Sequence, residues 1–254
     1  METGAITQYI DVAQIVLYMF WAFFAGLIYY LLRENHREGY PMDSGRENGP
    51  KVEGWPPVPS PKAFKTQEGH TYLSPDLARP DGTYSGKPTH GWNGAPLEPM
   101  GDPLLAGVGP GAWAMRADIP DADPHGHPKI VPLRVATDHS VAKQDVDPRG
   151  LPVWGADGVV AGTVVELWVD RMEMLFRYAE VQLVHSDKRV LLPMTFARIK
   201  KDGSHVQAIL AHQFANVPQT KSPEQITLLE EEKITAYYGA GTLYATPERQ
   251  EPIV

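Results

Sequence analysis

The stretch from Val12 to Leu32 constrains this chain more than any other feature of its sequence. Its 21 residues carry no charged side chain, and Gln14 is the one strongly polar residue among them. A helix of this length spans roughly 31 Å, close to the ~30 Å hydrocarbon core of a bilayer. Because the run is apolar on every face, it is typical of a membrane span and not of a soluble core helix. We therefore predict a transmembrane helix over residues 12–32.

The residues on either side of this run predict how the helix is inserted. No Lys or Arg precedes it and no small-residue cleavage site follows it, so it lacks the marks of a cleaved signal peptide. Arg33 and Arg37 come directly after the run, and the positive-inside rule places such residues in the cytoplasm. We expect residues 1–11 to lie outside the cytoplasm and the rest of the chain to be cytoplasmic after a single pass. The absence of cysteine agrees with a reducing compartment and excludes a disulfide framework or a thiol nucleophile.

Composition divides the chain beyond the helix into two parts. Residues 41–132 contain 17 Pro and 13 Gly, whereas residues 133–254 contain 7 of each. Proline removes a backbone donor and glycine is costly to order, so the first part is expected to be extended. It carries more aromatic side chains than a free linker does, which predicts that it drapes over a protein surface. We expect residues 33–132 to be an extended cytoplasmic segment packed on partner subunits, and residues 133–254 to be a cytoplasmic domain.

The second part has the pattern of a small β domain. Its strand signals are short, and turn signals such as Ala156-Asp157-Gly158 and Lys201-Asp202-Gly203 separate them. The spacing leaves no room for crossover helices, which predicts an antiparallel sheet closed or nearly closed into a barrel. The expected strands are Lys129–Val135, Val159–Val169, Leu175–Val184, Val190–Ile199 and Val206–Leu210.

Two finer expectations follow for this domain. Residues 175–184 alternate, which predicts a buried face and a wet face. The buried face would hold Ala179, Val181 and Leu183, and the wet face Tyr178, Glu180 and Gln182. A C-terminal helix is expected near Leu228–Tyr238, because Thr227 and Glu230 have capping-box spacing and Gly239 or Gly241 offers a stop.

Overall charge and one glycine motif exclude two kinds of ligand. With a net charge of −8 and a pI of about 5.6, the chain is a poor match for nucleic acid. Residues 107–112 fit the dinucleotide pattern G-x-G-x-x-A, but Pro110 lies inside the motif and no strand signal precedes it. A phosphate-binding turn needs that strand and a helix after it, so we interpret the motif as a plain loop.

The first candidate site is Asp123-Pro124-His125-Gly126-His127. In an extended segment His125 and His127 project to the same side, and Asp123 joins them at a period of two. Two imidazoles and a carboxylate suit weak surface binding of a divalent metal, or the capture of protons. The alternative is a flexible solvated loop with neither role.

The second candidate site lies where one predicted strand turns into the next. Asp170 and Glu173 are close in sequence, Arg177 follows them, and a pair of carboxylates can pass protons. An ordinary charged hairpin at a sheet edge is the favoured interpretation from the residues alone. No P-loop, nucleophile elbow or H-E-x-x-H motif occurs, so an independent enzyme has no support from the sequence.

A family resemblance appears just after the apolar run, at Arg37-Glu38-Gly39-Tyr40-Pro41. With the single uncleaved helix before it, this sequence resembles the H subunit of the purple-bacterial photosynthetic reaction centre. Similar segments follow in order at Pro61-Lys62-Ala63-Phe64, Gly101-Asp102-Pro103, Gly107-Val108-Gly109-Pro110, Lys129-Ile130-Val131-Pro132, Asp147-Pro148-Arg149-Gly150-Leu151-Pro152, Leu167-Trp168-Val169-Asp170, Leu191-Leu192-Pro193, Phe214-Ala215-Asn216-Val217-Pro218 and Ile226-Thr227-Leu228-Leu229-Glu230-Glu231.

The resemblance implies a fold, a location and a set of partners. The fold is membrane-anchored and mainly β, with one transmembrane helix, an extended Pro/Gly-rich segment and a PRC-type barrel domain with a C-terminal helix. The subunit is expected in the bacterial inner, intracytoplasmic photosynthetic membrane, without pigment or cofactor of its own. The L and M subunits would carry bacteriochlorophyll, bacteriopheophytin, quinones and non-haem iron. A cytochrome c subunit and a light-harvesting antenna ring are further partners in the family, together with membrane lipids.

The resemblance also assigns roles to particular residues. Such a subunit is expected to be non-catalytic, to cap and stabilise the L/M core, and to assist proton delivery to the secondary quinone. The proton-transfer candidates are Asp123, His125, His127, Asp170, Glu173 and Arg177, and the first three form the weak metal site. The lipid-headgroup candidates are Arg33, Arg37 and Tyr40, at the end of the helix.

Two alternatives compete with this interpretation. An anchored metal-dependent hydrolase would use the His-Gly-His site, and would need further ligands and a pocket. An RNA-assembly factor built on a PRC barrel is opposed by the acidic charge and by the membrane span.

Overall fold

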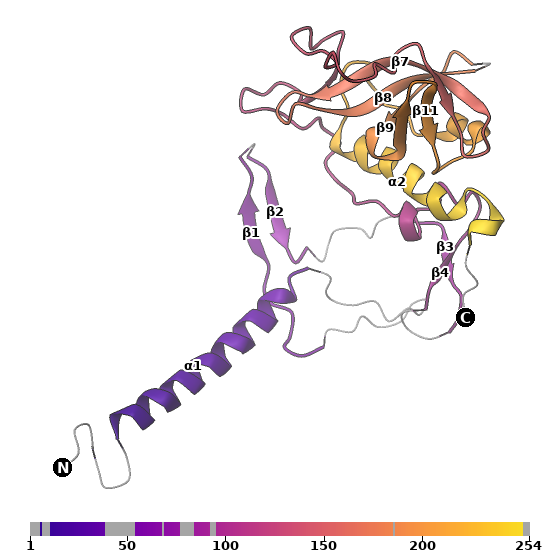
Figure 1. The fold of residues 1–254 in the computed structure, drawn as a ribbon. Helices are drawn as coiled ribbons and strands as arrows, with labels where there is room; N and C mark the ends of the chain where they lie inside the picture. The colour runs from indigo at the N-terminus through magenta and orange to yellow at the C-terminus, as the bar shows by residue number, and fades with distance from the viewer. Residues whose placement is uncertain are drawn as a thin grey trace. The chain divides into compact units, whose positions relative to one another are not determined.

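The computed structural model describes residues 6, 11–38, 54–67, 69–76, 84–91, 95–184 and 186–250. These residues fall into two units, one drawn from residues 1–81 and 90–95 and the other from residues 82–89 and 96–254. Figure 1 traces both units along the chain. Each unit has its own secondary structure and is described by itself.

The first unit holds the long apolar helix and one hairpin. Helix α1 (Val12–Asn35) is long and apolar enough to cross a membrane, and no residue of it is buried within the chain. The Asp11 side chain caps its first turn by accepting a hydrogen bond of 2.7 Å from the backbone N–H of Gln14. The hairpin pairs β1 (Lys62–Lys65) with β2 (Thr71–Ser74) in antiparallel register.

The second unit contains a hairpin, a large sheet and a helix. Strands β3 (Gly86–Pro88) and β4 (Leu97–Pro99) form the hairpin, and helix α2 (Leu228–Tyr244) lies below the sheet in the view of Figure 1. Short 3-10 helices connect the strands or follow α2: η1 (Gly109–Gly111), η2 (Met194–Phe196), η3 (Ala211–Asn216) and η4 (Pro247–Arg249).

The large sheet has seven strands. Its hydrogen-bonded path runs β10-β11-β6-β7-β8-β9, and β5 pairs with β7 beside this path. No pair between β9 and β10 closes the path among the described residues, and η2 links these two strands. The strands are β5 (Ile130–Pro132), β6 (Pro152–Trp154), β7 (Val160–Asp170), β8 (Leu175–Leu183), β9 (Arg189–Pro193), β10 (Ala197–Lys200) and β11 (Gly203–Val206).

The predicted class, a mainly β domain with an N-terminal apolar helix and a C-terminal helix, is confirmed. One core unites the sheet with α2, because Leu167, Val181 and Leu192 cluster with Ile234 and Tyr238 of the helix. Strand β5 joins the sheet just before the predicted domain start at residue 133. The Gly107–Ala112 motif includes η1, a single turn packed on α2.

Several strand predictions need correction. The strand expected over 190–199 is two strands, because the chain turns through η2 directly after Pro193. The last strand is Gly203–Val206 and not Val206–Leu210. Strand β6 was not predicted, and it pairs in parallel with β11, so the sheet is antiparallel apart from this one pair.

The wet face predicted for residues 175–184 is also wrong at two positions. Tyr178 and Glu180 are buried, with 4% and 6% of their surface exposed. Both are polar side chains with hydrogen-bond partners within the fold, so period-two alternation does not distinguish them from residues facing solvent.

The C-terminal helix begins as predicted but ends later. The Thr227 side chain accepts from the Glu230 backbone, and the Glu230 side chain accepts from the Thr227 backbone, which confirms the capping box. The stop expected at Gly239 or Gly241 is wrong, since α2 continues to Tyr244. These glycines serve close packing instead: a Cβ added at Gly239 would lie 2.6 Å from the carbonyl oxygen of Pro110.

Candidate functional site

The His-Gly-His segment lies in a tight hairpin that leads into the large sheet. The backbone N–H of Asp123 donates to the carbonyl of His127, and that of Lys129 donates to Asp121, each over 2.8 Å. Gly126 lies at the turn with a φ of +87°, a conformation that favours glycine. The segment is therefore a turn, and the expectation of an extended segment is wrong.

Asp123 stabilises this turn and places a fixed negative charge beside the two imidazoles. Its Oδ1 accepts the backbone N–H groups of His125 and His127, each at 2.8 Å, and its Oδ2 lies 3.3 Å from Nδ1 of His127. These hydrogen bonds, that of the His127 backbone foremost, hold the pKa of the Asp123 carboxyl below its ordinary value. Asp123 therefore stays ionised at neutral pH, while both imidazoles are exposed to solvent.

The hairpin does not bring three metal ligands together. The ring centroids of His125 and His127 are 6.4 Å apart, and Oδ1 of Asp123 is already engaged by two backbone donors. Across the described part of the chain, no group of three His, Asp or Glu side chains is arranged to hold a metal ion. The anchored-hydrolase alternative depended on such a centre and gains no support.

The second predicted cluster lies at the turn between β7 and β8. Asp170 is buried, and its Oδ1 accepts the backbone N–H groups of Met172 at 2.9 Å and Glu173 at 3.1 Å. The Arg177 guanidinium lies between the two carboxylates, with Nε 3.7 Å from Asp170 Oδ2 and Nη2 3.5 Å from Glu173 Oε2. The turn is a charged hairpin that also bridges both carboxylates through one arginine.

Strand pairing brings these two clusters, more than 40 residues apart in sequence, to the same end of the sheet. Ile130 of β5 pairs with Asp170 of β7, and the backbone N–H of Arg171 donates to the carbonyl of Lys129 over 3.0 Å. The Lys129 ammonium lies 2.8 Å from Oδ2 of Asp121. The hydrogen bond to Asp121 raises the pKa of Lys129, and the charges of Asp170 and Glu173 add to the effect.

The sequence did not single out Asp121, Lys129, Tyr178 or Glu231, which belong to the same region. Tyr178 follows Arg177 on β8, and its hydroxyl donates to Oε2 of Glu231 on α2 over 2.9 Å. Because Tyr178 was predicted to face solvent, it was not considered as a partner in a buried contact. Glu231 resembled an ordinary acidic residue in a first helical turn. Lys129 and Asp121 flank the His-Gly-His motif, so a search for charged pairs around that motif would have found them.

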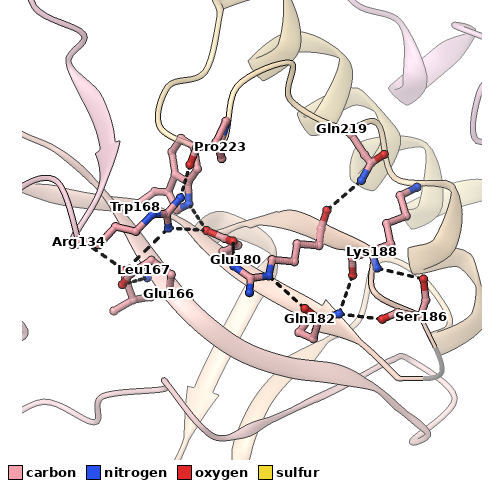
Figure 2. Close-up of polar contacts among 11 residues, drawn as sticks. Arg134, Glu166, Leu167, Trp168, Glu180, Gln182, Ser186, Lys188, Gln219 and Pro223 are labelled. Carbon is pink, nitrogen blue, oxygen red and sulfur yellow. Dashed lines mark hydrogen bonds and ion pairs between the residues drawn. The ribbon is translucent and has the colours of Figure 1, made fainter.

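A further buried carboxylate, Glu180, joins β8 to two flanking segments (Figure 2). Its Oε2 accepts Trp168 Nε1 and Arg134 Nη1, each at 3.1 Å, and its Oε1 accepts Arg189 Nη1 at 3.1 Å. Arg134 also donates to the carbonyl oxygen of Pro223. Because each oxygen of the carboxylate has a donor, Glu180 is a structural clamp between the sheet and the loop before α2.

The predicted lipid-headgroup residues lie at the end of α1, within the first unit. The Arg37 guanidinium is occupied by protein acceptors: Glu34 at 2.7 Å, the carbonyl of Ser60 at 2.7 Å and that of Ser74 at 3.0 Å. Arg33 is exposed in the last turn of the helix. Tyr40 lies outside the described residues, so the structure describes one free candidate of the three.

Two known families match this chain. Residues 4–135 match the photosynthetic reaction centre H-chain N-terminal region, which covers just over half of the chain. The chain belongs to the photosynthetic reaction centre H-chain family. Residues 142–212 match the PRC-barrel domain, which includes β6 to β11 of the large sheet.

Family membership establishes the general role of the chain, its association with a larger complex and its anchoring in a membrane. The chain is a subunit of a photosynthetic complex and associates with the reaction-centre core. Subunits of this family are structural, generally non-catalytic and bind no pigment. The long apolar helix and the family together indicate a membrane-anchored chain.

Proposed function

We propose that this chain caps the cytoplasmic side of the L/M core and passes protons from the cytoplasm toward the secondary quinone held there. The observation that carries the proposal is the pairing of Ile130 with Asp170. It places a solvent-exposed pair of imidazoles and a buried carboxylate at one end of one sheet. Quinone reduction consumes protons, and a site enclosed by protein needs titratable side chains to supply them.

The residues divide into surface and interior groups. His125 and His127 are exposed, and imidazole exchanges protons near physiological pH, so they are suited to uptake from bulk water. Oδ2 of Asp123 lies 3.3 Å from Nδ1 of His127, so a carboxylate and an imidazole meet at the surface of the hairpin. Lys129 follows this hairpin, and its carbonyl accepts the backbone N–H of Arg171, beside the Asp170–Glu173 pair.

The orientation of the chain across the membrane is also part of this proposal. Arg33 and Arg37 follow the apolar helix and no basic residue precedes it, which supports a periplasmic N-terminus and a cytoplasmic domain. Arg33 is the proposed lipid-headgroup contact of α1, since Arg37 is paired within the chain. The L and M subunits, their pigments, quinones and iron, and the photosynthetic membrane location are proposed on the same basis of family membership.

Replacing both His125 and His127 with Ala tests the proton-uptake role. In the assembled complex, we expect light-driven proton uptake to slow by about tenfold, less than the ~10²–10⁴-fold typical of acid–base groups, because surface carboxylates offer parallel routes. The effect should grow as the pH rises and bulk protons become scarce. The measurement is proton uptake after a flash, followed with a pH-indicating dye.

His212→Ala is the matched control, because His212 is an exposed histidine in η3, outside the two clusters. It should leave the uptake rate unchanged. An unchanged rate in the His125/His127 double variant at every pH would overturn the proposal.

A further inference from the structure

A pocket adjoins the carboxylate cluster on the side of helix α2. Its volume is about 420 Å³, and Arg177 and Tyr178 of β8 line it together with Glu231 of α2. Arg177 is also the residue that bridges Asp170 and Glu173. One guanidinium is thus shared between the proposed proton-transfer pair and a second, separate carboxylate.

Glu231 is partly buried in this pocket, among apolar as well as polar neighbours. Phe176, Pro193 and Met194 line the same space. The donor to its carboxylate is the Tyr178 hydroxyl, at 2.9 Å. Burial raises the pKa of Tyr178 far above its ordinary value, so this hydroxyl keeps its proton and remains a donor.

The charged groups that face Glu231 come from three directions. Arg177 lies on β8, Arg116 lies in the segment between η1 and β5, and Asp121 lies in the hairpin before β5. On α2 itself the next residue, Glu232, also lines the pocket; it pairs with Arg116 at 3.8 Å and accepts the backbone N–H of Ala114 at 3.3 Å.

Burial is the largest influence on this carboxyl, and it raises the pKa of Glu231 above its ordinary value. The hydrogen bond from Tyr178 and the charges of Arg177 and Arg116 act in the opposite direction, and Asp121 adds to the increase. Glu231 therefore binds a proton at a pH at which exposed carboxylates are already ionised.

We propose that Glu231 is a further proton-holding group of this cluster, which exchanges protons with Asp170 and Glu173 through the pocket that it shares with Arg177. This inference rests on the proton-delivery function proposed above. The step moves one proton and no electrons: a Glu231 oxygen gains an O–H bond while a hydronium ion or a protonated neighbour loses one. Arg177 couples the two sides, because its guanidinium lies 3.7 Å from Asp170 and 3.5 Å from Glu173 and also lines the pocket of Glu231.

The first test needs no partner subunit. Infrared titration of the full-length chain in detergent should show a carboxylic-acid signal that persists above the ordinary glutamate range and is lost in Glu231→Gln. In Arg177→Gln this signal should titrate at a higher pH, whereas Arg198→Gln, which removes an exposed arginine of β10, should leave it unchanged. A signal unaffected by Glu231→Gln, or one that does not move in Arg177→Gln, would overturn the inference.

The second test uses the assembled complex. Glu231→Gln should slow flash-induced proton uptake several-fold, and Glu224→Gln, which changes an exposed glutamate, should not. If the Asp170→Asn and Glu173→Gln double variant slows uptake while Glu231→Gln does not, the role of Glu231 is refuted and the proposed function stands. If none of these variants changes uptake, the proposed function itself fails.

Discussion

Glu180 has one carboxylate and three side-chain donors, and 6% of its surface is exposed. A buried carboxylate is tolerated when donors meet both of its oxygens, as Trp168, Arg134 and Arg189 do here. Removing it leaves the indole N–H without its acceptor and takes one acceptor from each of the two guanidinium groups. The contribution of Glu180 to stability thus depends on the hydrogen-bond partners of its carboxylate.

We predict that Glu180→Ala lowers the free energy of unfolding by about 2 kcal/mol, since it leaves the buried indole N–H of Trp168 without an acceptor. Glu180→Gln should cost less, because the amide oxygen still accepts from Trp168. Chemical denaturation of the full chain in detergent measures both changes. Glu224→Ala is the control, at an exposed position where we expect a change within about 0.5 kcal/mol. Equal stability of the Glu180→Ala and Glu224→Ala chains would contradict the clamp.

The start of helix α2 depends on local hydrogen bonds, whereas its glycines depend on packing against the rest of the domain. Its start is set locally, by the reciprocal hydrogen bonds of Thr227 and Glu230. The glycines Gly239 and Gly241 do not end the helix. Neighbouring segments pack so closely against it there that a side chain with a Cβ would not fit. A Cβ added at Gly241 would lie 2.5 Å from the carbonyl oxygen of Ala208 and 2.3 Å from Cγ2 of Ile209.

For this reason we predict that Gly241→Ala destabilises the protein, although alanine is the better helix former by ~1 kcal/mol. The clash involves a backbone oxygen that cannot rotate away, and overpacking of this kind costs about 1–3 kcal/mol. A net loss of about 1–2 kcal/mol is expected in thermal or chemical unfolding. Gly91→Ala serves as the control, since a Cβ there would meet nothing within 4 Å. A stabilised Gly241→Ala chain would show that propensity outweighs packing at this helix.

At the scale of the whole molecule, the chain joins an apolar helix with no buried residue to a domain that holds an extensive core. A bare helix of this kind is stable in lipid, where its backbone hydrogen bonds are satisfied within the helix itself. The candidate proton-transfer residues all lie in the second unit, and the basic residues that predict the orientation lie at the end of α1.

The orientation can be tested directly because the chain contains no cysteine. Single variants Ile6→Cys and Asp145→Cys each supply one exposed thiol, before α1 and within the second unit respectively. In sealed vesicles with the cytoplasmic face outward, a membrane-impermeant maleimide should label the Asp145→Cys chain and not the Ile6→Cys chain. Detergent should make both reactive, and the reverse pattern before detergent would refute the proposed orientation.

Features that depend on neighbours along the chain could be predicted from the residues alone. The span of α1 followed from 21 uncharged residues, the start of α2 from its capping box, and β7 and β8 from patterns that matched to within one residue at each end. The two helix features need only local hydrogen bonds or a uniform solvent, and the two strands show a periodic pattern of burial, so local residues encode them.

Features that depend on partners distant in sequence became visible only in the folded chain. The pairing of Ile130 with Asp170 joined the His-Gly-His turn to the carboxylate pair, and the contact of Tyr178 with Glu231 joined that pair to α2. The burial of Glu180 and the close packing of α2 at Gly241 depended in the same way on residues elsewhere in the chain. Charge and burial act through space, so the site emerges only when the sheet and the helix are packed together.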